Sequence, residues 1–96
     1  MDGYKKERMD DYLNKLIVSL SVELFKKEVN DSETVKKIVR SLFDSKVFTR
    51  IKMNKYLTVK ELVTICGISE EDMADKIMKR INFLEEAYMA KKEKTE

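Results

Sequence analysis

The chain contains no proline, and its only glycines are Gly3 and Gly67. These two residue types supply most of the breaks and tight turns on which all-β folds depend. A chain that lacks them has few ways to reverse direction, so helices become its default element. We therefore predict an all-α fold, in which residues 1–96 form one small domain of about four helices.

Charged residues make up 40% of the chain and hydrophobic residues 43%. This composition is too apolar for a disordered segment and suits amphipathic helices with solvated outer faces. Ser19, Ser21 and Glu23 interrupt the most apolar run, which argues against a signal peptide or a membrane span. The single cysteine, Cys66, rules out an intrachain disulfide and fits a reducing compartment. We expect a soluble, cytoplasmic protein.

The residue types needed for catalysis are scarce. The chain has no histidine, one cysteine and no glycine-rich loop. Most pairs of nucleophile and base, most zinc sites and most phosphate-binding loops are therefore excluded. We expect no enzyme activity, no metal and no cofactor, and we interpret Cys66 as a small buried hydrophobe.

A long first helix is predicted over residues 6–29. Its main apolar stripe recurs at steps of three and four, at Leu13, Leu16, Ile17, Leu20 and Leu24. A second stripe lies on a neighbouring flank, at Val18, Val22, Phe25 and Val29. So wide an apolar surface is either central in the bundle or shared with a second chain. Because 96 residues have little mass to cover both stripes, we expect a homodimer.

A second helix is predicted from a cap at Asp31 or Ser32 to about Val47. Its buried face comprises Val35, Ile38, Val39, Leu42 and Phe43, and its cations at Lys36, Lys37 and Arg40 point to solvent. The following residues, 48–57, fit either a short half-buried strand or a basic extended linker. Thr49, Ile51 and Met53 alternate there with Arg50, Lys52 and Asn54. In both cases Arg50, Lys52 and Lys55 should point outward.

Residues 58–72 hold two helix-start signals on either side of a turn. Thr58 and Glu61 have the spacing of a capping box, so a helix should start at Val59. Gly67 stands where that helix must end, in a left-handed conformation. Ile68 then fills the space between the helices, and Ser69 with Asp72 caps the next one.

These residues resemble the helix-turn-helix of small DNA-binding regulators. The similar positions are Leu-Thr-x-x-Glu-Leu-Val from Leu57, Cys-Gly-Ile-Ser from Cys66, and then Met73 and Ile77. The unit itself is assigned to residues 58–82. The resemblance implies that the second helix of the unit enters the major groove of DNA. Its outward residues would be Glu70, Glu71, Ala74, Asp75 and Met78, and the acids among them oppose the phosphate field. Residues 83–92 should extend this helix against the first helix or a second protomer, and 93–96 should fray.

The net charge of +2 is unevenly spread. Residues 36–60 carry eight Lys/Arg and one Asp/Glu, whereas residues 1–35 carry six and eight, and residues 61–96 carry six and nine. A basic block of this density indicates contact with an anion, most often nucleic acid, although a solvated helix face with a lysine-rich loop gives the same count.

We therefore predict a homodimeric DNA-binding transcriptional regulator that contacts double-stranded DNA. The predicted DNA contacts are Lys36, Lys37, Arg40, Arg50, Lys52, Lys55, Lys60, Lys79 and Arg80. The alternative is an inhibitor or adaptor of the kind that viruses and plasmids encode. It would use the acidic residues Glu70, Glu71 and Asp75 to block or recruit a larger protein.

Overall fold

The computed structural model describes the backbone of residues 2–52 and 55–95 and the side chains of residues 8–51 and 55–91. Over this part of the chain, the elements are α1 (Asp2–Lys26), α2 (Ser32–Asp44), β1 (Phe48–Lys52), β2 (Lys55–Thr58), α3 (Val59–Ile65) and α4 (Glu70–Thr95). The prediction of a small, mostly helical domain is confirmed, with a two-stranded sheet added. No helix in the described ranges has both the length and the apolar character needed to cross a membrane.

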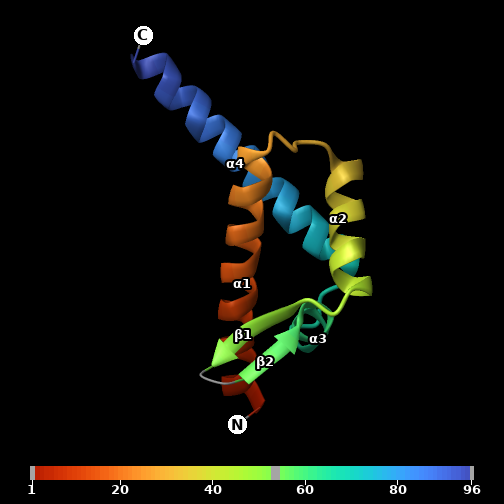
Figure 1. Ribbon diagram of the computed structural model, residues 1–96. Coiled ribbons are helices and arrows are strands. Elements are labelled where there is room, and N and C mark those ends of the chain that lie inside the picture. Colours follow the sequence, from red (N-terminus) through yellow and green to blue (C-terminus); the bar gives the residue numbers. More distant parts are fainter. Residues whose placement is uncertain (1, 53–54, 96) are drawn as a thin grey trace.

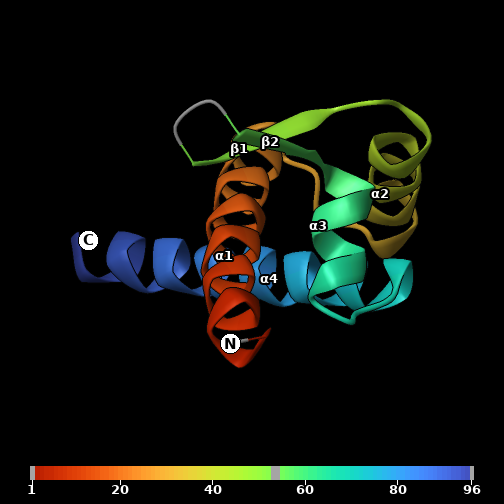
Figure 2. The same cartoon turned by 90° about the horizontal axis from the view of Figure 1, so that it is seen from below.

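The long helices α1 and α4 cross each other, and α2 packs beside the first half of α4 (Figure 1). The hairpin of β1 and β2 lies with α3 at one end of the molecule. Seen from below, the second half of α4 runs out past α1 (Figure 2). The first half of α4 therefore packs against the other helices, whereas its second half extends beyond them.

The core forms where the apolar faces of the four helices meet. Its fully or nearly fully buried members are Leu13, Ile17, Leu24, Val35, Val39, Val59, Leu62, Val63, Cys66, Met73, Ala74, Ile77 and Ile81. The main stripe predicted on the first helix is thus confirmed, with Leu16 and Leu20 half-buried at its edge. Ser21 lies among these residues, and its hydroxyl donates to the Ile17 carbonyl at 2.6 Å, which satisfies the buried oxygen.

The second stripe of α1 is mostly covered by the chain itself. Val22, Phe25 and Val29 are half-buried, and the ring of Phe25 meets that of Tyr88 on α4 edge to face, with centroids 6.1 Å apart. Val18 alone among the stripe is exposed, at 38%. α1 therefore leaves little apolar surface for a second chain.

Two helices end earlier than predicted, each for a local reason. α1 stops at Lys26 because Glu28 adopts a left-handed φ of 62°, and the Val29 amide donates back to the Leu24 carbonyl at 2.9 Å. α2 stops at Asp44, where the hydroxyl of Ser45 donates to the Ser41 carbonyl at 2.7 Å as the backbone becomes extended.

The N-terminal cap of α2 is Asp31, whose carboxylate accepts from the Thr34 amide. The Thr34 hydroxyl, which donates to the same carboxylate, and then the Thr34 amide lower the pKa of Asp31.

Strands β1 (Phe48–Lys52) and β2 (Lys55–Thr58) pair antiparallel as a hairpin, in which Thr49 pairs with Leu57 and Arg50 with Tyr56. The predicted alternation is confirmed where it is described, since Thr49 is half-buried and Arg50 exposed. The second strand was not predicted. Met53 and Asn54 lie outside the described residues, as does the side chain of Lys52.

The predicted caps on either side of Gly67 are both present. Thr58 Oγ1 accepts from the Glu61 amide and a Glu61 carboxylate oxygen accepts from the Thr58 amide, each at 3.1 Å. The Thr58 amide and the Thr58 hydroxyl both donate to this carboxylate, which lowers the pKa of Glu61. Ser69 Oγ likewise accepts from the Asp72 amide at 3.0 Å, while Asp72 accepts from the Ser69 amide at 3.2 Å. Gly67 has a φ of 73°. Helix α4 continues to Thr95, into the segment expected to fray.

Substitutions at the two left-handed positions should shift stability in opposite directions. A Cβ added at Gly67 meets nothing within 4 Å, so Gly67→Ala should cost only backbone conformation, about 1 kcal/mol of unfolding free energy. Glu28→Gly should raise the same free energy by about 0.5 to 1 kcal/mol, because it relieves the left-handed strain of a side chain. Urea unfolding followed by circular dichroism measures both. A neutral Gly67→Ala, or a destabilising Glu28→Gly, would contradict this account of the turns.

Candidate nucleic-acid interface

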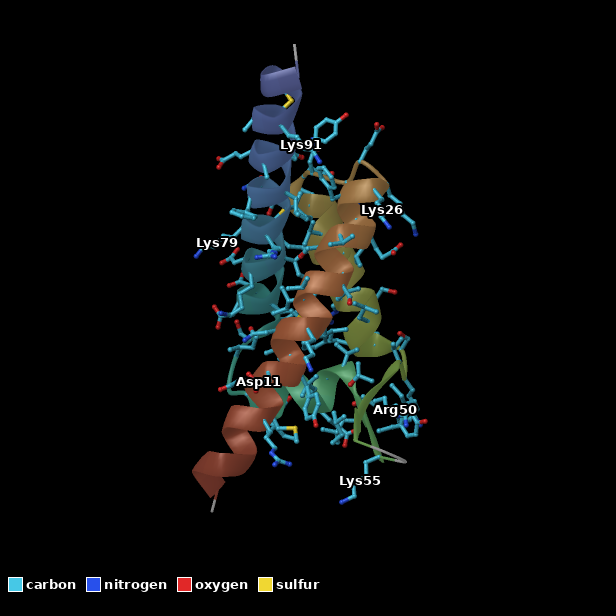
Figure 3. The ribbon with its side chains drawn as sticks, turned by 90° about the vertical axis from the view of Figure 1, so that its left-hand side faces the viewer. Asp11, Lys26, Arg50, Lys55, Lys79 and Lys91 are labelled. Carbon is cyan, nitrogen blue, oxygen red and sulfur yellow. The ribbon has the colours of Figure 1, made fainter. Side chains whose placement is uncertain are left out.

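The hairpin presents two of the predicted cations at one end of the molecule. Arg50 on β1 and Lys55 on β2 are both exposed, and Figure 3 shows them at the same end. Arg50 also borders a shallow hollow of about 180 Å³ against α1, lined by Tyr12, Lys15, Leu16, Ser19, Thr49 and Arg50. This lining contains two cations and no acid. Lys15 is thus a member of the basic hairpin end, which we define as Lys15, Arg50 and Lys55.

The outer face of the hairpin combines Arg50 with aromatic rings. Arg50 stands directly opposite Tyr56 in the antiparallel pairing, so their side chains share one face. Tyr56 is 57% exposed and Phe48, two residues before Arg50, is 59% exposed. Lys60 is exposed in the first turn of α3, two residues after β2 ends.

The three cations of α2 are exposed as predicted, but Arg40 and Lys36 lie close to acids. The Arg40 guanidinium is 3.3 Å from a carboxylate oxygen of Glu70 and 3.5 Å from one of Asp44. Lys36 lines a small hollow of about 290 Å³ together with Glu70, Glu71 and Ala74. Lys37 is exposed on the same helix. The basic block at 36–60 is therefore divided, because its helical part faces the acidic start of α4.

Lys79 and Arg80 lie in a different region, on α4 beside α1. They line a groove of about 480 Å³ with Asn14, Ile17, Val18, Lys76 and Phe83. The Arg80 guanidinium lies over the Phe83 ring at 5.2 Å from its centroid. Figure 3 shows Lys79 on the opposite side of the molecule from Arg50. The structure does not bring these two cations together with the basic hairpin end.

Fewer residues at the start of α4 face solvent than predicted. Glu71 and Asp75 are exposed, but Glu70 is half-buried beside Arg40. Ala74 is only 2% exposed and Met78 is half-buried, so neither is available as an outward residue. Lys36 on α2 lines the same hollow as Glu70 and Ala74, so the packing of α2 along α4 covers these two positions, which the sequence alone leaves on the outward face.

Sequence reasoning missed Lys15 and the pairing of Arg40 with Glu70. Both depend on contacts between residues about thirty or more positions apart in the chain, for which no local pattern gives a signal. The exposure of Arg50, by contrast, follows from the alternation in β1.

Charged and aromatic side chains on an open surface suit contact with a large, anionic partner better than enclosure of a small molecule. Within the described residues, no three His, Cys, Asp or Glu side chains are placed to hold a metal ion. Cys66 is buried in the core. When the chain was compared with protein-family models, curated proteins and solved structures, none of them matched.

Proposed function

We propose that the protein binds double-stranded DNA as a homodimeric regulator, and that the basic hairpin end makes the main contact with the phosphates. The observation behind this proposal is the gathering of Lys15 and Arg50 from distant parts of the chain around a hollow without an acid. Among the described side chains, Asp11 precedes Lys15 by about one helical turn but makes no ion pair with it, and it lies on the other side of the molecule from Arg50 (Figure 3). Cations left unopposed in this way attract phosphates over the range of a Debye length.

The hairpin also supplies contacts that a lysine-rich linker lacks. Arg50 can donate two parallel hydrogen bonds to one phosphate, and the neighbouring ring of Tyr56 offers a flat surface and a hydroxyl donor. Two strands fix the spacing between Arg50 and Lys55, so less side-chain and backbone freedom is lost on binding.

The pair α3 and α4 supports the helix-turn-helix part of the proposal through its two caps and the left-handed Gly67. The exposed acids Glu71 and Asp75 oppose deep entry of α4 into the major groove. We therefore infer that binding is dominated by the DNA backbone and discriminates weakly between sequences.

Reversing the hairpin charges should weaken binding to every duplex by a similar factor. In Arg50→Glu/Lys55→Glu, two phosphate contacts are lost, so the slope of log K against log salt should become shallower by about 1.8. Fluorescence anisotropy with several unrelated duplexes at four salt concentrations measures the slope. Lys26→Glu/Lys27→Glu is the matched control, since it makes the same charge change at the end of α1, far from the hairpin (Figure 3).

Equal losses in the hairpin variant and the control would show that only net charge matters, and would overturn the proposed interface. Binding of the unaltered protein that does not respond to salt would overturn the proposal as a whole.

Capture of a basic protein through the acidic start of α4 is the second candidate, favoured by the exposure of Glu71 and Asp75 without an ion pair to any other described residue. Glu71→Lys/Asp75→Lys separates the two functions and leaves the pair of Glu70 with Arg40 intact. We expect this variant to bind duplex DNA several-fold more tightly, because two like charges are removed from the phosphate field. Unchanged DNA binding, together with the loss of a protein partner isolated with the unaltered chain, would favour the second candidate.

A further inference from the structure

We infer that α4 is the surface on which two copies of this chain associate, packed antiparallel so that the basic segment of one helix meets the acidic segment of the other. We define the basic segment as Lys76, Lys79 and Arg80, and the acidic segment as Glu85 and Glu86. This inference rests on the homodimer in the proposed function and does not depend on how the protein contacts DNA.

The second half of α4 exposes three large apolar side chains to solvent. Phe83, Tyr88 and Met89 are 56%, 56% and 53% exposed, and Figure 2 shows this part of the helix extending past α1. The second stripe of α1, the other apolar surface considered for a partner, is mostly covered by the chain itself. α4 is therefore the better surface for a second copy.

Two hollows along α4 have opposite charge. The groove beside α1, of about 480 Å³, is lined by the basic segment together with the apolar Val18 and Phe83 and contains no acid. The next hollow along the helix, of about 470 Å³, is lined by the acidic segment together with Asn82, Met89 and Ala90 and contains no cation. The basic groove of one copy could therefore pair with the acidic hollow of another copy.

The spacing of these charges selects an antiparallel arrangement. Lys79 and Glu86 are seven residues apart, which is about two turns or 10.5 Å, so they project from nearly the same side of α4. A two-fold axis between Asn82 and Phe83 places Lys79 of one copy opposite Glu86 of the other, twice per dimer. The same operation places Met89 opposite Lys76, where its side chain can reach the apolar part of the groove.

A parallel arrangement in register would instead set Lys79 against Lys79 and Glu86 against Glu86, which costs energy. Ion pairs on a surface add little affinity because water screens them. Phe83 and Met89 would therefore supply most of the attraction, while the charges fix the direction of the two helices.

A charge exchange between two variants tests this arrangement directly. Lys79→Glu alone places two acids opposite each other at both ends of the contact, and Glu86→Lys alone places two bases there. We expect each variant by itself to dimerise at least about tenfold more weakly than the unaltered chain. An equimolar mixture should recover dimers, since a heterodimer contains one exchanged pair and one original pair. Sedimentation velocity over a concentration series measures all three samples, and circular dichroism checks that each variant is folded.

Lys46→Glu and Glu33→Lys serve as matched controls because both positions are exposed and lie outside α4. Neither these variants nor their mixture should alter dimerisation. Single α4 variants that dimerise normally, a mixture that stays as weak as its components, or an unaltered chain that sediments as 11.4 kDa at every concentration would overturn the inference. A monomer that still shows the salt-dependent DNA binding of the hairpin would overturn the dimer surface and leave the phosphate contact standing.

Discussion

The packing of one apolar stripe of α4 against both α1 and α2 holds the molecule together. Met73, Ile77 and Ile81 are fully buried, and α1 and α2 each make their main helix contact with α4. Burying side chains of this size away from water stabilises the fold by about 1.5 to 3 kcal/mol each. The charged surfaces of α2 and α4 take their relative positions from this packing.

The same packing separates charges that the sequence places together. Because α2 lies along the first turns of α4, Arg40 comes within reach of Glu70 and Lys36 lies beside Glu71. Within the basic block at 36–60, Arg50 instead borders a hollow without an acid, which Lys15 joins from α1. The charges that are unevenly spread along the sequence are thus divided among three surfaces. These are the basic hairpin end, the side where cations of α2 meet acids of α4, and the basic and acidic segments that follow each other along α4. This division explains why we place the phosphate contact on the hairpin and the second copy on α4.

Features set by neighbouring residues were predictable from the sequence, and features set by distant residues were not. The caps at Thr58 and Ser69 and the left-handed Gly67 are local, and all three were placed correctly. Glu28 adopts a left-handed conformation without glycine, so the end of α1 had no local signal. The second strand of the hairpin was missed because only the pairing with β1 makes it a strand. In the candidate site, the exposure of Arg50 was predicted, whereas its proximity to Lys15 depends on the tertiary fold.

The most direct test of the account is to map by nuclear magnetic resonance which amides shift when a short DNA duplex is added. The account predicts that the largest changes cluster at Lys15, Arg50, Lys55 and Tyr56, and that they diminish together as salt is raised. Glu71 and Asp75 at the start of α4 should change little. Changes centred on the start of α4, with the hairpin unaffected, would contradict the account.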